Sequence, residues 1–299
     1  MKYGVRSIGI ICALLAAIFN GTVGVFSVGL YENGLSSEDI AFLKCLIALL
    51  VVGFVLVLSK KTLITLKYFK EKYISIAICS FFGFFTLYFF ETAAYKTTNI
   101  SVVVFFLFGV STLVTFIGGA IIEKRFFRKN ECFSFILALI GIYFVFLGNF
   151  RIEGGSYGLI YSCIAGAGYG LFIVLSKKLS IGSGFSTIFS LLIFGCIYLF
   201  VPFAVQYKVL PYDISTIMVL VVLAILPTAG GFWLTTKAID ILEPKSVQLI
   251  ELTEPIFAII FSFIFLSQLI TLYQVIGGVL IIAAIVISEY SPKKYVELH

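Results

Sequence analysis

The amino-acid sequence predicts an all-α integral membrane protein with ten transmembrane helices, arranged as two inverted five-helix repeats. Three observations predict this fold. First, 61% of the 299 residues are apolar and only 12% are charged, which is more apolar surface than the core of a water-soluble domain can hide. Second, the apolar residues gather into ten runs of close to 20 residues, enough to cross a hydrocarbon core of about 30 Å. Third, the order of features in the first half recurs about 144 residues later.

Five of the runs lie in residues 1–149, the first expected repeat. The first run follows Lys2 and Arg6, as in a signal peptide, but it continues past Asn20 without a small-residue cleavage motif. We therefore expect an uncleaved span, and polar or basic stretches separate it from the next four. The five expected spans are Ile8–Leu30, Ile40–Leu58, Ile74–Tyr95, Ser101–Ile122 and Cys132–Gly148.

The other five runs lie in residues 150–299, the second expected repeat. None of the ten runs alternates polar and apolar residues over about 10 positions, as the strands of a membrane barrel do. We therefore expect helices, which satisfy their own backbone hydrogen bonds in lipid. The five expected spans of this half are Tyr157–Leu175, Phe185–Val205, Ile217–Ile239, Val247–Ser267 and Leu272–Ser288.

The basic residues predict how the spans are oriented. An even number of spans puts both termini on one side, and if that side is the cytoplasm, 17 of the 21 Lys and Arg residues lie inside. Only Lys96, Arg151 and Lys208 then lie outside, while Lys44 falls within a span. This bias follows the positive-inside rule. We expect a multi-pass protein of the cytoplasmic membrane with both termini cytoplasmic.

The two halves share a rhythm of loops and helices. Ala94, a short loop and a long apolar helix that ends at Glu123 are matched by Ala238, a short loop and a helix that ends at Ser267. Because each half has an odd number of spans, the second half enters the membrane from the opposite side. Inverted repeats of this kind are typical of alternating-access transporters, whose site lies near the midplane where the halves meet.

Several short stretches carry a resemblance to a known family. They are Leu43-Lys44 with Ala48 in the second span, Ala94-Tyr-Lys at the end of the third, Glu254-Pro255-Ile-Phe-Ala in the ninth, and Tyr273-Gln274-Val-Ile-Gly277-Gly278 in the tenth. With these residues the chain resembles the drug/metabolite transporter superfamily, and specifically its EamA-type members, over essentially its whole length. Two residues depart from the family pattern. Ser111 stands where the first repeat often has proline, and Ser267 replaces a common glutamate.

The resemblance implies a secondary active transporter of a small metabolite, such as an amino acid, an amine or a drug-like compound, that works by alternating access. We expect export, and coupling to protons is one option. The alternative is an importer or exchanger of a cationic or quaternary amine. More remote alternatives are an intramembrane lipid enzyme, which would need a nucleophile or metal cluster at a membrane face, and a non-transporting subunit, for which intramembrane glutamates would be a needless cost.

Other features of the sequence limit its chemistry and partners. His299 is the only histidine, the six cysteines are scattered singly, and no Gly-rich Lys-Ser/Thr loop is present, so we expect no enzyme activity, no cofactor, no metal site and no direct use of ATP. The basic clusters lie between apolar runs, which indicates a membrane surface and not nucleic acid. The expected partners are a small-molecule substrate and the lipid bilayer. Gly118-Gly119 and Gly277-Gly278 could pack within one chain or between two copies, so a homodimer is a further option.

Ionisable residues inside a membrane are costly and therefore candidates for function. Lys44 lies about six residues from the outer end of its span and Glu91 about five, which puts both roughly 8 to 9 Å deep on the same side. They could form a structural ion pair between neighbouring helices. Glu91 could instead bind substrate or a proton.

One face of the third span combines a carboxylate with aromatic rings. Phe84, Tyr88, Glu91 and Tyr95 follow one another at helical spacing, which places them on the same face. A carboxylate beside Tyr88 would suit a cationic amine through charge and cation–π attraction. Ordinary helix packing is the competing interpretation, because Phe and Tyr are abundant in this chain.

The ninth span carries Gln248, Glu251 and Glu254 at intervals of three residues. Pro255 removes the helical hydrogen bond to the carbonyl of Glu251, which leaves a polar pocket beside two carboxylates. Glu251 and Glu254 are the candidates for proton coupling, and Gln248 is a candidate substrate ligand. The competing interpretation is a kink with interfacial glutamates that pair with Lys237 or Lys245.

The remaining candidate substrate ligands come from three other spans. Trp233 and Thr235 lie in the eighth span, after two glycines that permit close approach, and the repeat places Thr235 opposite Glu91. Asn20 in the first span and Tyr169 in the sixth precede glycines at corresponding places in the two halves, where a glycine can soften a helix. We expect these residues to line the cavity or to act at hinges.

Overall fold

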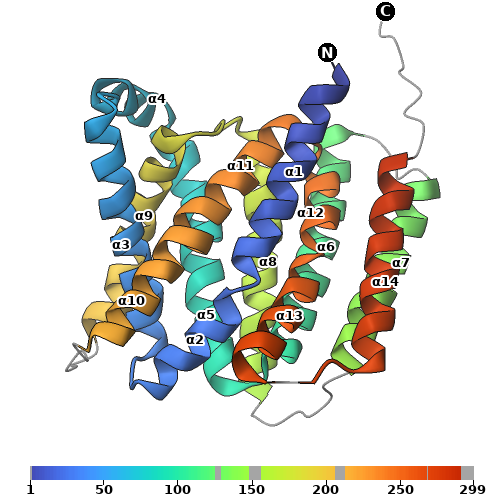
Figure 1. The fold of residues 1–299 in the computed structure, drawn as a ribbon. Coiled ribbons are helices and arrows are strands. Elements are labelled where there is room, and N and C mark those ends of the chain that lie inside the picture. The colour runs from blue at the N-terminus through green and yellow to red at the C-terminus, as the bar shows by residue number, and fades with distance from the viewer. Residues whose placement is uncertain (1, 125–128, 148–155, 206–212, 268, 291–299) are drawn as a thin grey trace, which may run out of the picture.

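The computed structural model describes residues 2–124, 129–147, 156–205, 213–267 and 269–290, and these ranges contain helices and turns but no strand (Figure 1). The helices of the first half are α1 (Lys2–Asn20), α2 (Val23–Glu32), α3 (Ser37–Leu58), α4 (Thr62–Ser80), η1 (Phe81–Thr86), α5 (Leu87–Thr97), α6 (Ile100–Glu123) and α7 (Lys129–Leu147). Those of the second half are α8 (Ser156–Lys178), α9 (Phe185–Val205), α10 (Ile214–Leu223), η2 (Ala224–Gly231), α11 (Phe232–Ile241), α12 (Pro244–Glu251), α13 (Glu254–Leu266) and α14 (Leu272–Tyr290).

The predicted transmembrane fold is confirmed. Among the described residues, nine helices are long and apolar enough to cross a membrane, and the apolar helix Leu272–Ser288 supplies the tenth predicted span. Gly148, the predicted end of the fifth span, lies outside the described residues, as does the predicted boundary between the repeats at residues 149 and 150. The helix that contains the third predicted span begins before that span, because α4 is already helical from Thr62. The start of α1 and the end of α14 lie at the same end of the bundle (Figure 1).

Two of the spans are broken in the middle. The first is divided into α1 and α2 at Gly21 and Thr22, and the ninth into α12 and α13 at Leu252 and Thr253. Pro255 cannot donate a hydrogen bond back into α12, which accounts for the second break. The break in the first span packs on the beginning of α13, since a β-carbon added to Gly21 would lie 2.9 Å from the β-carbon of Phe257.

Two other spans contain π-helical segments. These are η1 in the third span and η2 in the eighth, and their starts at Phe81 and Ala224 are close to the 144-residue spacing of the sequence pattern. In η2, Pro227 lacks the N–H that a regular α-helix needs, and the Thr228 hydroxyl donates to the Leu223 carbonyl five residues earlier at 2.9 Å. Such segments are rare in helices and often occur at functional sites.

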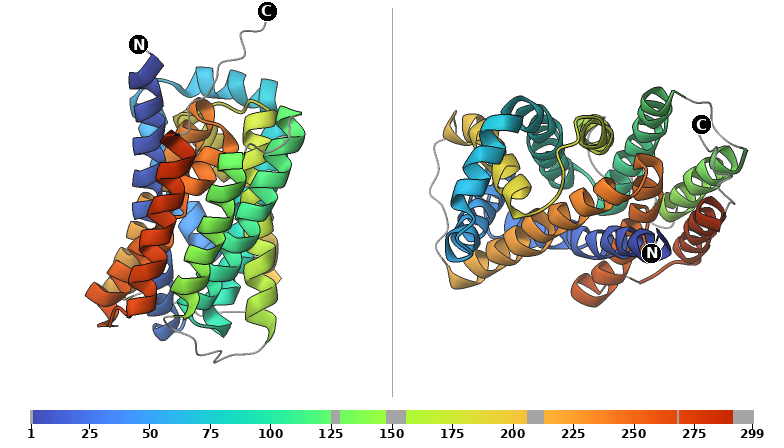
Figure 2. Two further views of the ribbon diagram at one scale, coloured as in Figure 1. Left: turned by 90° about the vertical axis from the view of Figure 1, so that its right-hand side faces the viewer. Right: turned by 90° about the horizontal axis from the view of Figure 1, so that it is seen from above.

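The two halves are interleaved in space. Helix α8 of the second half packs along α6 of the first, so closely that a β-carbon added to Gly166 would overlap the Leu107 carbonyl group. Seen along the helix axes, α7 lies beside α14 on one side of the bundle, and α3, α4, α9 and α10 lie on the opposite side (Figure 2). A β-carbon on Gly277 of α14 would lie 2.7 Å from the Val145 nitrogen of α7. Small residues thus let backbones approach within one chain.

Candidate functional site

A cavity lies in the middle of the bundle, where the two halves meet. It encloses about 370 Å³ of space between atoms, counting the part open to solvent. Three of its lining residues are charged, namely Lys44 of α3, Glu91 of α5 and Glu254 of α13. The other polar lining residues are Asn20, Tyr88, Tyr169 and Thr228. Both halves therefore contribute polar groups to one site, as expected for a cavity at the interface of inverted repeats.

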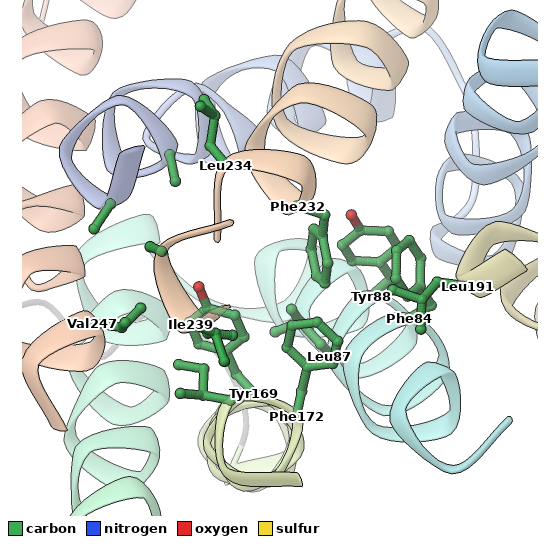
Figure 3. Packing of buried hydrophobic residues seen from close by; sticks show 14 of the residues in the cluster. Phe84, Leu87, Tyr88, Tyr169, Phe172, Leu191, Phe232, Leu234, Ile239 and Val247 are labelled. Carbon is green, nitrogen blue, oxygen red and sulfur yellow. The ribbon is translucent and has the colours of Figure 1, made fainter. Parts of the chain in front are cut away.

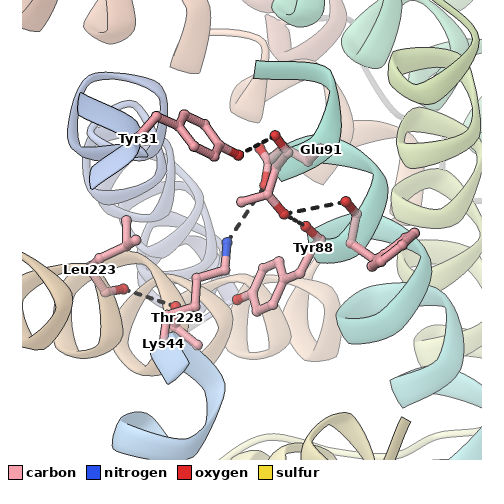
Figure 4. A network of polar contacts seen from close by, with 8 residues as sticks. Tyr31, Lys44, Tyr88, Glu91, Leu223 and Thr228 are labelled. Atoms are coloured by element: carbon pink, nitrogen blue, oxygen red, sulfur yellow. Dashed lines mark hydrogen bonds and ion pairs between the residues drawn. The ribbon is translucent and has the colours of Figure 1, made fainter. Parts of the chain in front are cut away.

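Lys44 and Glu91 lie together, as their equal depth in the sequence predicts. The Lys44 ammonium is 3.9 Å from the Glu91 carboxylate, and both side chains are buried (Figure 4). The same ammonium lies 3.8 Å from the centroid of the Tyr88 ring. At 3.9 Å the pair is too long for a hydrogen bond, and among the described residues the Lys44 ammonium has no hydrogen-bond partner.

The aromatic face predicted on the third span is only partly turned toward the cavity. Tyr88 and Glu91 line it, whereas Phe84 and Tyr95 are buried beside it. Phe84 lies in the π-helical η1, where the residues no longer follow the α-helical spacing that the prediction assumed. Its ring and that of Tyr88 pack on Phe232 of α11, with ring centroids 4.5 and 5.4 Å apart (Figure 3).

Glu254 begins α13 directly after the break in the ninth span, and its carboxylate faces the cavity. The Asn20 side chain, at the end of α1, lines the same cavity beside this carboxylate. Gly231 leaves room for the Asn20 side chain. A β-carbon at Gly231 would overlap the Asn20 amide oxygen. Polar residues next to both helix breaks therefore lie on the cavity wall.

Glu251 is completely buried and does not line the cavity. Its carboxylate accepts hydrogen bonds from the Tyr169 hydroxyl of α8 and, at 2.7 Å, from the Thr235 hydroxyl of α11. The competing interpretation paired the glutamates of this span with Lys237 or Lys245. The Lys245 ammonium is instead 3.7 Å from the Glu131 carboxylate, and that of Lys237 lies 5.4 Å from the centroid of the Trp233 ring.

Gln248 also lies away from the cavity, against hydroxyl groups of α6. Its amide nitrogen donates to Ser111 at 2.9 Å and to Thr112 at 3.3 Å, and its amide oxygen accepts from Thr115 at 3.4 Å. These three hydroxyls were not among the site residues predicted from the sequence. The sequence did contain a feature that indicates them. Several hydroxyl side chains lie close together in an apolar span, and such side chains need hydrogen-bond partners in neighbouring helices.

Trp233 and Thr235 of α11 do not line the cavity either. The Trp233 ring stacks on Phe185, with centroids 5.5 Å apart, and Thr235 is engaged with Glu251. The lining residues that the sequence analysis missed are mostly apolar, and several belong to η2 and its flank. These are Val23, Leu87, Leu107, Phe108, Pro227, Thr228 and Phe232. Pro227 lies inside an apolar run, and this proline is the sequence feature that indicates an irregular helix at η2.

The described residues include no group of three or more His, Cys, Asp and Glu side chains that could hold a metal ion. The arrangement is one ammonium and two carboxylates around a small cavity, with several aromatic rings and hydroxyl groups beside them. Such a site can bind a small charged molecule by charge-assisted hydrogen bonds, which are the strong ones.

Comparison with known proteins gives matches over nearly the whole chain. The model that describes the EamA-like transporter family matches residues 7–147 and again residues 156–290. A relative from Bacillus subtilis (strain 168), named "Uncharacterized transporter YxxF", is 24% identical over 294 residues, which cover 95% of this chain and 90% of the relative. A solved structure titled only "Crystal structure of protein" has a TM-score of 0.76 at 13% identity, covering 95% of this chain and 96% of the other, and is similar in fold.

Proposed function

We propose that this chain, which belongs to the EamA-like transporter family, is a secondary active transporter that moves a small metabolite across the cytoplasmic membrane. The family and the relative named as a transporter support membrane transport itself, and members of this family are in general not enzymes. The observation that carries the proposal is the cavity between the halves. Its lysine and two glutamates would be costly inside a membrane without a charged or polar ligand.

The positions of the helix breaks and of the π-helical segments support alternating access. The breaks in the first and ninth spans lie beside Asn20 and Glu254 on the cavity wall, and η2 supplies Thr228 to the same wall. Discontinuous helices around a midplane site are typical of transporters that rock one group of helices against another. In our proposal these breaks and π-helical segments are the places where the helices bend as the cavity changes side.

We propose export in exchange for protons, with Glu254 as the coupling carboxylate. It faces the cavity, and in the described part of the chain no lysine or arginine forms an ion pair with it. A substrate cation would compete with a proton for this carboxylate, because both neutralise the same charge. Proton entry would then drive substrate exit. Glu251 is the second candidate, although it lies behind Tyr169.

Uptake or exchange of a cationic amine is the second candidate function. The two carboxylates outnumber the single ammonium in the cavity, which favours a cation. The Tyr88 ring, however, already contacts the Lys44 ammonium at 3.8 Å, so this ring is less available to a second cation than the sequence pattern suggests.

The proposed orientation has both termini in the cytoplasm. It is supported by the distribution of basic residues, since Lys60, Lys61 and Lys67 flank the start of α4 at the same end of the bundle as the start of α1 (Figure 1). The bilayer is the expected environment of the exposed apolar side chains. Ile121, Val201 and Val279 are examples, each more than half exposed.

Ligand binding followed by transport tests the proposed function. Detergent-purified protein is screened by thermal unfolding against amino acids, quaternary amines, polyamines, sugars and drugs, because a ligand at about 100 times its Kd adds roughly 2.7 kcal/mol to the free energy of unfolding. The compounds that raise the Tm are then offered to proteoliposomes under a pH gradient. We expect accumulation that a protonophore abolishes. If compounds bind but none crosses the membrane above the rate in protein-free liposomes, the proposed transport is wrong.

A further inference from the structure

Helix α4 begins well before the part of it that is needed to cross the membrane. The helical stretch from Thr62 to Thr97 has 36 residues, whereas about 20 residues span a hydrocarbon core. The predicted third span starts only at Ile74, and four of the residues from 62 to 73 are charged. These residues, the leading segment of α4, lie across the end of the bundle and not along it (Figure 2). This is the position of an interfacial helix, which lies in the plane of the membrane surface.

One face of the leading segment packs on the protein. The Tyr68 hydroxyl donates to the Ile181 carbonyl, and the Lys72 ammonium donates to the Ser180 carbonyl at 3.3 Å. Both carbonyls belong to the connection between α8 and α9. Thr65 is buried on the same face, as the spacing of three and four residues requires. The leading segment therefore joins the first half of the chain to the second at this end of the bundle.

The remaining surface of the leading segment is exposed and carries apolar side chains. Leu63, Leu66 and Tyr73 are each more than half exposed, and the exposed Lys70 lies among them. An interfacial helix buries such apolar side chains at the boundary between the lipid headgroups and the acyl chains. The aliphatic part of a lysine lies along the same apolar layer, while its ammonium reaches the headgroups.

The charge of the leading segment determines which headgroups it fits. Five lysines lie in the segment or directly before it, namely Lys60, Lys61, Lys67, Lys70 and Lys72. Glu71 is the one acidic residue of the segment, and its carboxylate is 4.0 Å from the Lys67 ammonium, with both side chains exposed. Positive charge is therefore in excess. Clusters of four or more basic residues beside a transmembrane helix attract anionic lipids.

We infer that the leading segment of α4 is a binding surface for anionic phospholipids of the cytoplasmic leaflet. Its exposed apolar side chains enter the boundary of the bilayer, and its lysines bind the headgroup phosphates by charge-assisted hydrogen bonds. The leaflet follows from the proposed orientation, and the surface does not depend on which substrate the cavity takes. Because the same segment contacts the connection between α8 and α9, bound lipid also stabilises the contact between the two halves.

Fluorescence quenching by brominated lipids tests the inference. Trp233 is the only tryptophan, so Trp233→Phe/Leu66→Trp carries one tryptophan, on the exposed surface of the leading segment. The variant is placed in nanodiscs of equimolar phosphatidylcholine and phosphatidylglycerol, with either one or the other lipid brominated on its acyl chains. We expect phosphatidylglycerol to associate about five-fold more strongly than phosphatidylcholine, the effect of one lysine near an anionic surface. High salt should reduce this preference.

Lys67→Gln/Lys70→Gln in the same background removes two exposed ammonium groups and leaves the packed face unchanged. We expect the tryptophan still to be quenched, but with the preference for phosphatidylglycerol reduced toward one. Lys96→Gln is the matched control. It removes an exposed lysine in the last turn of α5, at the far end of the same span, and should leave the preference unchanged.

The chain with its native tryptophan gives a second measurement that does not depend on the reporter variant. Its Tm should be higher in nanodiscs of phosphatidylglycerol than in nanodiscs of phosphatidylcholine, and Lys67→Gln/Lys70→Gln should narrow this difference. Equal quenching by the two lipids, or a preference that survives in the double lysine variant, would overturn the inference. Quenching by neither lipid would overturn it as well, because the segment would then lie outside the bilayer.

Discussion

The three intramembrane carboxylates differ in their surroundings, and these surroundings separate their expected roles. Glu91 lies beside the Lys44 ammonium, and Glu251 accepts hydrogen bonds from the Tyr169 and Thr235 hydroxyls. Glu254 faces the cavity, with the Asn20 amide beside it. A group that exchanges protons must be within reach of the substrate or water that delivers them. Glu254 therefore fits proton coupling better than Glu251 does.

Neutralising Glu254 should uncouple transport from the pH gradient. In Glu254→Gln the proton has no carboxylate to bind at the cavity, while Lys44 and Glu91 remain. We expect substrate exchange across proteoliposomes to persist, although more slowly, and accumulation driven by a pH gradient to be lost. Parallel measurements of counterflow and of gradient-driven uptake check this. Glu71→Gln on the exposed part of α4 is the control and should match the wild type.

The matching change at Glu251 should affect stability first. A glutamine there can accept with only one of its two side-chain heavy atoms, so one of the Tyr169 and Thr235 hydroxyls loses its acceptor, which costs about 1 to 3 kcal/mol. We expect Glu251→Gln to have a lower Tm and to retain gradient-driven accumulation. Loss of accumulation in Glu251→Gln together with normal accumulation in Glu254→Gln would assign the coupling to Glu251 instead.

For single residues, the sequence predicts which side chains lie at the same depth in the membrane and can therefore pair. It does not predict where a side chain points when a helix break precedes it. Lys44 and Glu91 meet because their spans place them at equal depth. Gln248, Glu251 and Glu254 were expected on one face of the ninth span, next to a carbonyl freed by Pro255. The break at Leu252 and Thr253 places Glu254 on α13, toward the cavity, while Gln248 and Glu251 stay on α12 against other helices.

The irregular helices are the elements that build the cavity. Pro255 and Pro227 signal two of the irregularities in the sequence, because proline removes a helical hydrogen bond. The π-helical η1 has no proline, and its one glycine, Gly83, packs so closely on Phe172 that a β-carbon would overlap the ring. A single glycine in an apolar run is too weak a signal to predict such a segment. Its position follows from contacts with α8, which are distant in sequence.

The close contact of α6 and α8 gives a prediction for stability. A methyl group at Gly166 would overlap the Leu107 backbone, so Gly166→Ala must push the two helices apart. Overpacking of this kind costs about 1 to 3 kcal/mol, and occasionally more. We expect a lower Tm in detergent, measured by thermal unfolding of the purified variant.

Gly109→Ala is the matched control for this prediction. It adds the same methyl group on α6, at a position where a β-carbon has no neighbour within 4 Å. Replacing glycine by alanine inside a helix stabilises by about 0.5 to 1 kcal/mol when there is space, so the Tm should stay the same or rise. Equal Tm values for the two variants would show that α6 and α8 do not pack closely at Gly166.

For the whole molecule, the number and order of the spans could be predicted because each depends on its own length and hydropathy. The pairing of spans could not, because helix α8 of the second half packs along α6 of the first through shape and not through a sequence signal. The glycines that could have joined two copies, such as Gly119 and Gly277, pack within one chain. A homodimer therefore stays a prediction without support from them. Arg151, predicted to lie outside the cytoplasm, is not among the described residues.

In the proposed transport cycle, the cavity between the halves opens to each side of the membrane in turn. Labelling of a single cysteine tests it most directly. Thr228→Cys is introduced on the cavity wall after the six native cysteines are replaced. A membrane-impermeant maleimide is then applied to right-side-out and to inside-out vesicles, with and without a compound that raises the Tm.

We predict that the cysteine reacts from both sides, and that the ligand shifts reactivity from one side toward the other, because one residue on a midplane site is exposed alternately. Wild-type-like transport by the same variant would show that the labelled protein is functional. Reactivity from one side only, unchanged by any ligand that binds, would contradict alternating access, because a cavity that never reaches the second side cannot carry a substrate across.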